Sequence, residues 1–120
     1  ICFCPKLYEV VIGTGKGSLV IIDTRKYEIM KVLKAHEKGI YAVNIDQEDR
    51  YCFSGGGEGA VKIWDMNTFE NVGHINNVHT TKNVKSRQKW RSIAITDIEI
   101  RDRLVYTCGL DGNINCIEFS

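Results

Sequence analysis

Short apolar runs separated by polar turns follow one another along most of the chain. Three stretches share one pattern, namely EVVIGTGKGSLVIID from residue 9, YCFSGGGEGAVKIWD from residue 51 and LVYTCGLDGNINCIE from residue 104. Each has an apolar run, a glycine-rich turn and a second apolar run that ends in an acid. The runs are short, rich in β-branched residues and almost without a helical period, so they predict strands joined in hairpins.

Two independent markers of this pattern recur at the same spacing. The turn glycine and the closing acid both return after 42 and then 53 residues. The glycines are Gly17, Gly59 and Gly112, and the acids are Asp23, Asp65 and Glu118. We therefore expect a repeated all-β unit, because self-similarity at a fixed period marks repeat architectures. The strands are expected at about 1–4, 8–13, 18–23, 29–34, 40–46, 51–55, 60–65, 70–76, 92–100, 104–109 and 114–119.

The middle copy is the most complete and runs KAHEKGIYAVNIDQEDRYCFSGGGEGAVKIWDMNTFENV. It resembles a WD repeat, a β-propeller blade with a G-H pair early and a W-D pair late, and here the pairs are Ala35-His36 and Trp64-Asp65. The resemblance implies a β-propeller fragment of four-stranded antiparallel WD-repeat blades. It implies a blade at 1–34, a blade at 35–76, a basic inter-blade loop at 77–91 and an incomplete blade at 92–120 that lacks its last strand.

A complete WD repeat also implies a hydrogen-bonded tetrad, which satisfies polar groups at the buried ends of the strands. By this resemblance its members here are His36, Ser54, Glu58 and Trp64. Glu58 stands where the family has Asp and is one methylene longer, so its bond to the turn N–H groups is in question. The alternative is a metal-binding or catalytic His36, but no second His or Cys lies at ligand spacing.

The outer copies keep only part of this tetrad. Thr107 and Asp111 remain in the third copy, but Ile117 replaces the Trp there. In the first copy Lys16 takes the position of the acid and Ile22 that of the Trp.

The turn GTGKGS in the first copy has some of the composition of a phosphate-binding loop. Its spacing differs, because Gly17 separates Lys16 from Ser18 and a predicted strand, not a helix, follows. We therefore expect a hairpin turn in which Gly17 has a positive φ and Lys16 faces solvent. The alternative is a nucleotide-hydrolysing protein that binds ATP or GTP through Lys16.

The second repeat interval is longer than the first because extra residues separate the second and third copies. From Thr80 to Arg91 this segment has five basic residues and no acidic one. Together with Lys16, the candidate partner-binding residues are Lys82, Lys85, Arg87, Lys89, Trp90 and Arg91. A cationic loop on a rigid scaffold can bind an acidic protein segment or a phosphate-bearing polyanion. The alternative is a solvated loop without a partner.

Composition excludes several classes of protein. The net charge is only +1, which gives no overall attraction to nucleic acid or membrane, and no apolar run is long enough for a transmembrane segment. Five cysteines without paired spacing argue against a disulfide framework and indicate a reducing compartment, the cytoplasm or the nucleus. No catalytic motif is recognisable among the histidines and possible nucleophiles, so we expect no enzyme activity, metal or cofactor.

Fewer than three complete blades cannot close a ring, so we expect the C-terminal part of a larger propeller whose remainder belongs to the same parent chain. The predicted function is a non-catalytic scaffold that binds other proteins in a complex through its turns and the basic loop. The alternative function is recognition of acidic lipid or nucleic acid by the loop at 82–91.

Overall fold

The computed structural model describes residues 2–4, 8–46, 48–75, 80–82, 90–92, 94–110 and 114–118. Regular structure in these residues is entirely β-strand. The strands are β1 (Cys2–Cys4), β2 (Glu9–Gly13), β3 (Ser18–Asp23), β4 (Glu28–Lys34), β5 (Ile40–Ile45), β6 (Tyr51–Gly56), β7 (Val61–Asp65), β8 (Asn71–Ile75), β9 (Thr80–Lys82), β10 (Trp90–Ser92), β11 (Ile95–Arg101), β12 (Leu104–Gly109) and β13 (Ile114–Glu118).

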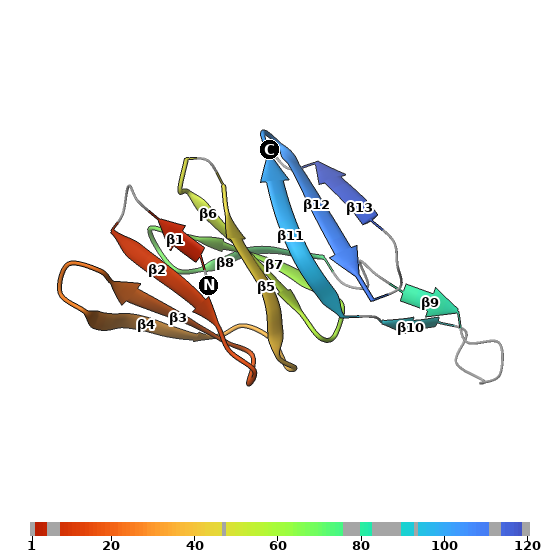
Figure 1. Cartoon of the computed structure of the whole chain (residues 1–120), viewed down its shortest axis with the longest axis horizontal. Helices are drawn as coiled ribbons and strands as arrows, with labels where there is room; N and C mark the ends of the chain where they lie inside the picture. Colours follow the sequence, from red (N-terminus) through yellow and green to blue (C-terminus); the bar gives the residue numbers. More distant parts are fainter. Residues whose placement is uncertain are drawn as a thin grey trace.

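The strands form three antiparallel meanders in chain order. We call them sheet 1 (β1-β2-β3-β4), sheet 2 (β5-β6-β7-β8) and sheet 3 (β11-β12-β13). The sheets stand side by side in Figure 1, and β5 adjoins β1 on one side and β11 on the other. The predicted all-β class and the four-stranded antiparallel units are therefore confirmed.

The register in which the first two strands pair is the same in sheets 2 and 3 at one irregular position. In sheet 2 a β-bulge follows Ile40, which pairs with Gly56, and in sheet 3 the same irregularity follows Ile95, which pairs with Gly109. The two sheets are thus built alike at the beginning of their first strands, although their sequences differ there.

The segment that connects sheets 2 and 3 differs from the expected loop. Within it β9 pairs with β10, with Trp90 opposite Lys82 and Ser92 opposite Thr80. Thr and Trp favour extended backbone, so the two ends of the segment can pair as a short hairpin. As a result Ser92 ends β10, and the first strand of sheet 3 begins at Ile95, three residues later than the sequence suggested.

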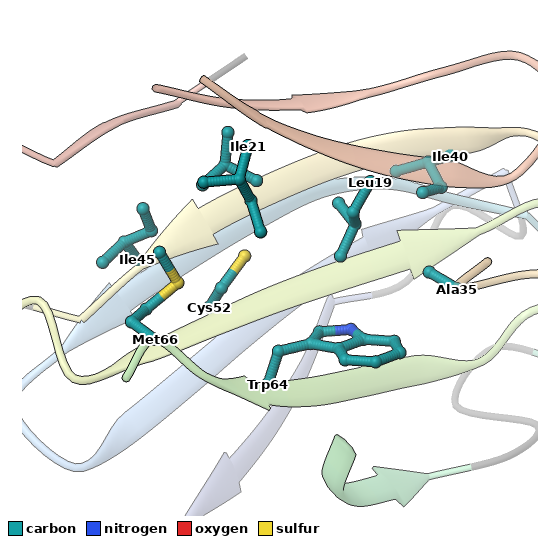
Figure 2. Close-up of a cluster of buried hydrophobic side chains, with 9 residues drawn as sticks. Leu19, Ile21, Ala35, Ile40, Ile45, Cys52, Trp64 and Met66 are labelled. Atoms are coloured by element: carbon teal, nitrogen blue, oxygen red, sulfur yellow. The ribbon is translucent and has the colours of Figure 1, made fainter. Parts of the chain in front are cut away.

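Sheets 1 and 2 bury a shared apolar core. Figure 2 shows Leu19 and Ile21 of sheet 1 lying over Cys52 and Trp64 of sheet 2. The buried members of this core are Val11, Leu19, Ile21, Ala35, Ile40, Ile45, Cys52, Trp64 and Met66. Each sheet thus covers the face of its neighbour, and this burial is the main favourable contribution to holding the two sheets together.

The core between sheets 2 and 3 is less completely filled. Trp64 pairs with Cys52 in sheet 2, whereas Ile117 pairs with Val105 at the same place in sheet 3. A cavity of about 70 Å³ lies beside Ile117 and is lined by Phe53, Val61, Ile63, Ile75, Val105, Ile117 and Glu118. We attribute the cavity to the smaller side chain, because an indole fills the corresponding space between sheets 1 and 2.

Candidate functional site

The glycine-rich turn of sheet 1 holds the chain that passes from sheet 1 to sheet 2. The carbonyl of Gly17 accepts hydrogen bonds from the N–H groups of Ala35 and His36, both at 2.9 Å. The carbonyl of Thr14 accepts one from Ile40 N–H, also at 2.9 Å. The turn therefore uses its backbone to hold the neighbouring sheet, which leaves these carbonyls facing the protein and not a ligand.

The linker backbone passes so close to position 17 that only glycine fits there. Its φ is 87°, in the left-handed region, and a Cβ there would overlap the carbonyl oxygen of His36 and lie 2.6 Å from that of Lys38. Gly59, at the same place in sheet 2, has a φ of 84°. The positive φ predicted for Gly17 is confirmed, and Gly59 shares it, while Gly112 lies outside the described residues.

These turns lie on one face of the molecule, along the lower edge in Figure 1, and we call it the glycine-turn face. It comprises the turns Thr14–Gly17 and Gly57–Gly59, the linker residues Glu37–Gly39, the start of β5 with Tyr41, and Leu110. Gly57 N–H donates to the Gly39 carbonyl at 2.9 Å, and Leu110 N–H donates to the Ala94 carbonyl at 3.2 Å. The β9–β10 pair extends from the same edge in Figure 1.

Hydrogen bonds join the four proposed tetrad side chains in sheet 2. Trp64 Nε1–H donates to Ser54 Oγ at 3.1 Å, and Ser54 Oγ lies 2.7 Å from His36 Nε2. His36 Nδ1 contacts Glu58 Oε1. Ser54 and His36 are almost completely buried, so these contacts supply partners that water cannot supply there.

The hydrogen bonds of this tetrad are consistent with a neutral His36. Ser54 accepts from Trp64, so its hydroxyl hydrogen is free to donate to His36 Nε2, and His36 Nδ1–H then donates to Glu58. This arrangement requires a neutral imidazole. Burial lowers the pKa of His36 below its usual value, against the opposing effect of Glu58, and so favours that neutral form. Glu58 Oε2 is buried without a hydrogen-bond partner among the described residues.

The outer copies differ at the same positions. Thr107 is completely buried at the place of Ser54, and Ile117 lines the cavity at the place of Trp64. Lys16 is exposed at the place of Glu58, and its carbonyl accepts a hydrogen bond of 2.6 Å from Lys34 Nζ. Asp111 lies outside the described residues.

The structure places only some of the candidate partner-binding residues. Lys82 belongs to β9, and Trp90 and Arg91 belong to β10, so pairing brings these three backbones together. Lys85, Arg87 and Lys89 lie outside the described residues. Lys16 lies on the glycine-turn face, in the turn whose carbonyls hold the linker.

Two exposed apolar side chains on the glycine-turn face were not expected from the sequence. Tyr41 is 62% exposed and Leu110 is 74% exposed. Strand alternation gave no signal for Tyr41, because it is the extra residue of the β-bulge between Ile40, which packs toward sheet 1, and Ala42, which packs toward sheet 3. Comparison of the three copies was the signal for Leu110, because Gly15 and Gly57 stand at its place in the other turns.

Metal sites and membrane-spanning helices are both absent from the described part of the chain. No three His, Cys, Asp or Glu side chains there are grouped so that they can hold a metal ion. Nor does any helix in that part have the length and apolar character needed to cross a membrane.

The repeated meanders, packed face to face with the linker held by the preceding turn, define the chain as a piece of β-propeller protein. Residues 27–65 match the family model described as WD domain, G-beta repeat. The chain also superposes on the Cps50 (Swd1) β-propeller domain from Myceliophteria thermophila with a TM-score of 0.76 at 16% identity, over 97% of this chain and 33% of that one. The chain belongs to the WD-repeat family of β-propeller proteins.

Two curated relatives are similar over most of the chain. DmX-like protein 1 from Mus musculus is 27% identical over 118 residues, which are 95% of this chain and 4% of that protein. THO complex subunit 6 homolog from Danio rerio is 32% identical over 95 residues, which are 78% of this chain and 29% of that protein. The chain thus spans only a small part of the length of these relatives.

Proposed function

We propose that the chain is part of a non-catalytic protein-interaction scaffold. It contributes its glycine-turn face to a larger WD-repeat propeller, of which it forms the C-terminal part. The observation that carries the proposal is the make-up of this face. Backbone hydrogen bonds fix its turns and linker, and Tyr41 and Leu110 are exposed there beside the long basic segment. Rigid scaffolds that display long loops commonly use them to bind partners. One relative is named as a subunit of a complex, which supports the same role.

The uncovered face of sheet 1 supports a further blade next to it. Val10, Ile12, Val20 and Ile22 of this face are at the same places as residues of sheet 2 that face sheet 1. Tyr27 is 88% exposed, whereas Phe69 at the same place in sheet 2 packs against the core between sheets 1 and 2. A neighbouring blade would cover these apolar side chains as sheet 1 covers those of sheet 2.

Sheet 3 supports the proposal that the chain is part of a larger propeller. Among the described residues this sheet has three strands, whereas sheets 1 and 2 have four each. The edge strand β13 therefore presents unpaired backbone groups, and a fourth strand, as in sheets 1 and 2, would satisfy them. The proposed blades are 1–34, 35–76 and 92–120, with 77–91 as the segment between the second and the third.

We place the protein in the cytoplasm or the nucleus. Support comes from the cysteines, because Cys2, Cys52, Cys108 and Cys116 form no disulfide in the described part of the chain. A reducing compartment suits a chain with this pattern.

Site-specific photo-crosslinking tests the scaffold function. Lys16, on the glycine-turn face, is replaced by a photoreactive phenylalanine derivative, and the protein is irradiated in cells. We expect crosslinks to a distinct partner protein, identified by mass spectrometry. The matched control carries the same group at Lys26, an exposed residue in the turn at the other end of sheet 1. Equal crosslinking patterns from both positions, or none from either, would contradict the proposal.

Anion recognition by the loop at 82–91 is the second candidate function, favoured by five basic residues without an acid. Phosphate binding depends on displaced counterions, so affinity for anionic vesicles or oligonucleotides should fall steeply with salt. The double variant K85E/R87E should abolish this binding, while K26E/R103E should not change it. Affinity that is insensitive to salt would rule out this function and leave the protein-binding one.

A further inference from the structure

The chemistry of the partner can be inferred from the glycine-turn face, on the assumption that the proposed scaffold function holds. We propose that this face binds an acidic, extended peptide segment with a large apolar side chain. The apolar side chain would lie on Tyr41, and flanking carboxylates would lie beside Lys16 and Lys38. Neither Tyr41 nor Lys38 belongs to the basic segment between sheets 2 and 3.

The aromatic ring of Tyr41 is available because its neighbour lacks a side chain. A Cβ placed on Gly57 would lie 3.2 Å from Tyr41 Cε2 and 3.2 Å from Lys38 Cβ. Glycine at this position therefore leaves the ring and the lysine stem uncovered, and Tyr41 remains 62% exposed. An exposed tyrosine held by buried strand neighbours offers a large contact area at a low entropic cost.

Positive charge lies directly beside this ring. The Lys38 carbonyl is only 2.6 Å from a Cβ placed on Gly17, so Lys38 adjoins the turn that carries Lys16. Both lysines are exposed, and the Nζ of Lys34 adds a third charge where it binds the Lys16 carbonyl.

The carboxylates nearby do not cancel this charge. Glu37 is the exposed acid of the linker segment 37–39, and Glu58 keeps its negative charge beside the neutral His36. These two carboxylates lie near the three lysines Lys16, Lys34 and Lys38. The positive charges therefore outnumber the negative ones, and complementarity calls for an acidic partner.

Leu110 extends the apolar part of the surface to sheet 3. Its N–H binds the Ala94 carbonyl in the same way as Gly57 N–H binds the Gly39 carbonyl, so it stands on the same face. Its side chain is 74% exposed. An aliphatic contact of this kind suits a peptide side chain better than a nucleobase, which favours a peptide over a nucleic acid.

The frame beneath the surface is already ordered. Gly17 and Thr14 hold the linker by three backbone hydrogen bonds of 2.9 Å. A preorganised site loses little conformational freedom when it binds, so a short segment can be held with useful affinity.

Fluorescence polarisation with a defined probe tests this inference on the purified protein. The probe is a labelled peptide in which runs of Asp and Glu flank a central Leu-Phe pair. We expect saturable binding that Tyr41→Ala and Lys38→Glu each weaken by about tenfold or more. The matched controls Tyr27→Ala and Lys26→Glu change exposed residues of the same types in the turn at the other end of sheet 1 and should leave the affinity unchanged.

Other outcomes separate this inference from the scaffold function. Unchanged affinity in both Tyr41→Ala and Lys38→Glu would overturn the acidic-peptide site, and so would no binding of the probe. Tighter binding of an oligonucleotide of equal charge, lost in the same variants, would assign the face to nucleic acid instead. If crosslinking through position 16 still captures a partner, the scaffold function survives any of these results.

Discussion

Ser54 is a small residue on which two larger buried polar groups depend. Its hydroxyl lies between Trp64 Nε1 and His36 Nε2, and the residue is completely buried. Without this hydroxyl, the indole N–H and the imidazole nitrogen would both lack a partner in the core. An unsatisfied buried group costs more free energy than the bond itself contributes.

We therefore predict that Ser54→Ala lowers the free energy of unfolding by about 1–3 kcal/mol. Urea denaturation of the purified protein measures this change. Ser18→Ala serves as control, because Ser18 uses its backbone N–H and not its hydroxyl in the bond to Thr14 Oγ1. Equal stability of the two variants would mean that the tetrad contributes nothing to folding.

The protonation of His36 predicts a dependence of stability on pH. Burial lowers the pKa of the folded state below the ordinary 6.5, so the unfolded chain takes up this proton at a higher pH than the folded protein does. The free energy of unfolding should consequently fall as the pH drops below about 6.5. Denaturation curves at several pH values between 7.5 and 5 measure the trend.

Glu9 acts in the opposite direction and must be removed from this experiment. It is buried opposite Asp23 on β3, and burial, together with the charge of Asp23, raises the pKa of Glu9. Its proton therefore stabilises the folded state as the pH falls. We propose to work in a Glu9→Gln background, in which the trend from His36 should be steeper. Stability that rises toward low pH in that background would contradict a neutral His36.

For single residues, the sequence predicted the place in the repeat better than it predicted the hydrogen-bond partners. The family resemblance proposed His36, Ser54, Glu58 and Trp64 as a tetrad, and hydrogen bonds join these side chains. It did not reveal that Glu58 binds His36 with one oxygen while the other lacks a partner. Such details depend on side-chain length and on the backbone around the turn, which no spacing encodes.

The glycine-rich turn is the element on which the connection between sheets depends. Two glycines of this turn differ in their surroundings. Gly17 has a positive φ and lies against the linker. Nothing lies within 4 Å of a Cβ placed on Gly15. The same turn thus offers a matched pair of substitutions.

We predict that Gly17→Ala lowers the free energy of unfolding by at least about 2 kcal/mol, because the new methyl group would collide with the linker backbone. Gly15→Ala should change it by less than about 0.5 kcal/mol. Thermal and urea denaturation compare the two variants. A similar loss in both would show that turn composition, rather than contact with the linker, sets the stability.

The elements themselves were largely predictable. Apolar runs bounded by Gly, Asn and Asp located the strands of all three sheets within a few residues, since each sheet repeats one hairpin pattern. The β9–β10 pair was missed because its strands are only three residues long, and the surrounding lysines and arginines indicated a solvated loop. Pairing there depends on the two ends being brought together by the fold.

At the scale of the whole molecule, the uncovered face of sheet 1 sets the next prediction. Ile22 is half-buried there, at the place of Trp64 in sheet 2. If another blade covers this face, Ile22→Asp buries an unpaired charge and should cost at least about 2 kcal/mol of unfolding free energy. Lys31→Asp is the control, because Lys31 is exposed on the outer strand β4. Equal, small effects of both would mean that solvent and not protein meets this face.

The arrangement of the sheets was predictable only through the repeat. Equal intervals between glycines and acids indicated similar units stacked in order, and the sheets do pack in order. We did not predict that the core between sheets 2 and 3 would be less completely filled than the core between sheets 1 and 2, although the sequence shows Ile117 in place of Trp. A smaller side chain leaves a cavity only where the surrounding strands do not move in to fill the space, and the sequence does not show whether they do.

The cavity beside Ile117 makes the boundary between sheets 2 and 3 compressible. Hydrostatic pressure favours states of smaller volume, so the boundary lined by Phe53, Val61 and Ile117 should be the first to separate and admit water as pressure rises. A hollow of about 70 Å³ with apolar walls is also suited to a xenon atom, which would stiffen the boundary between sheets 2 and 3 by occupying it.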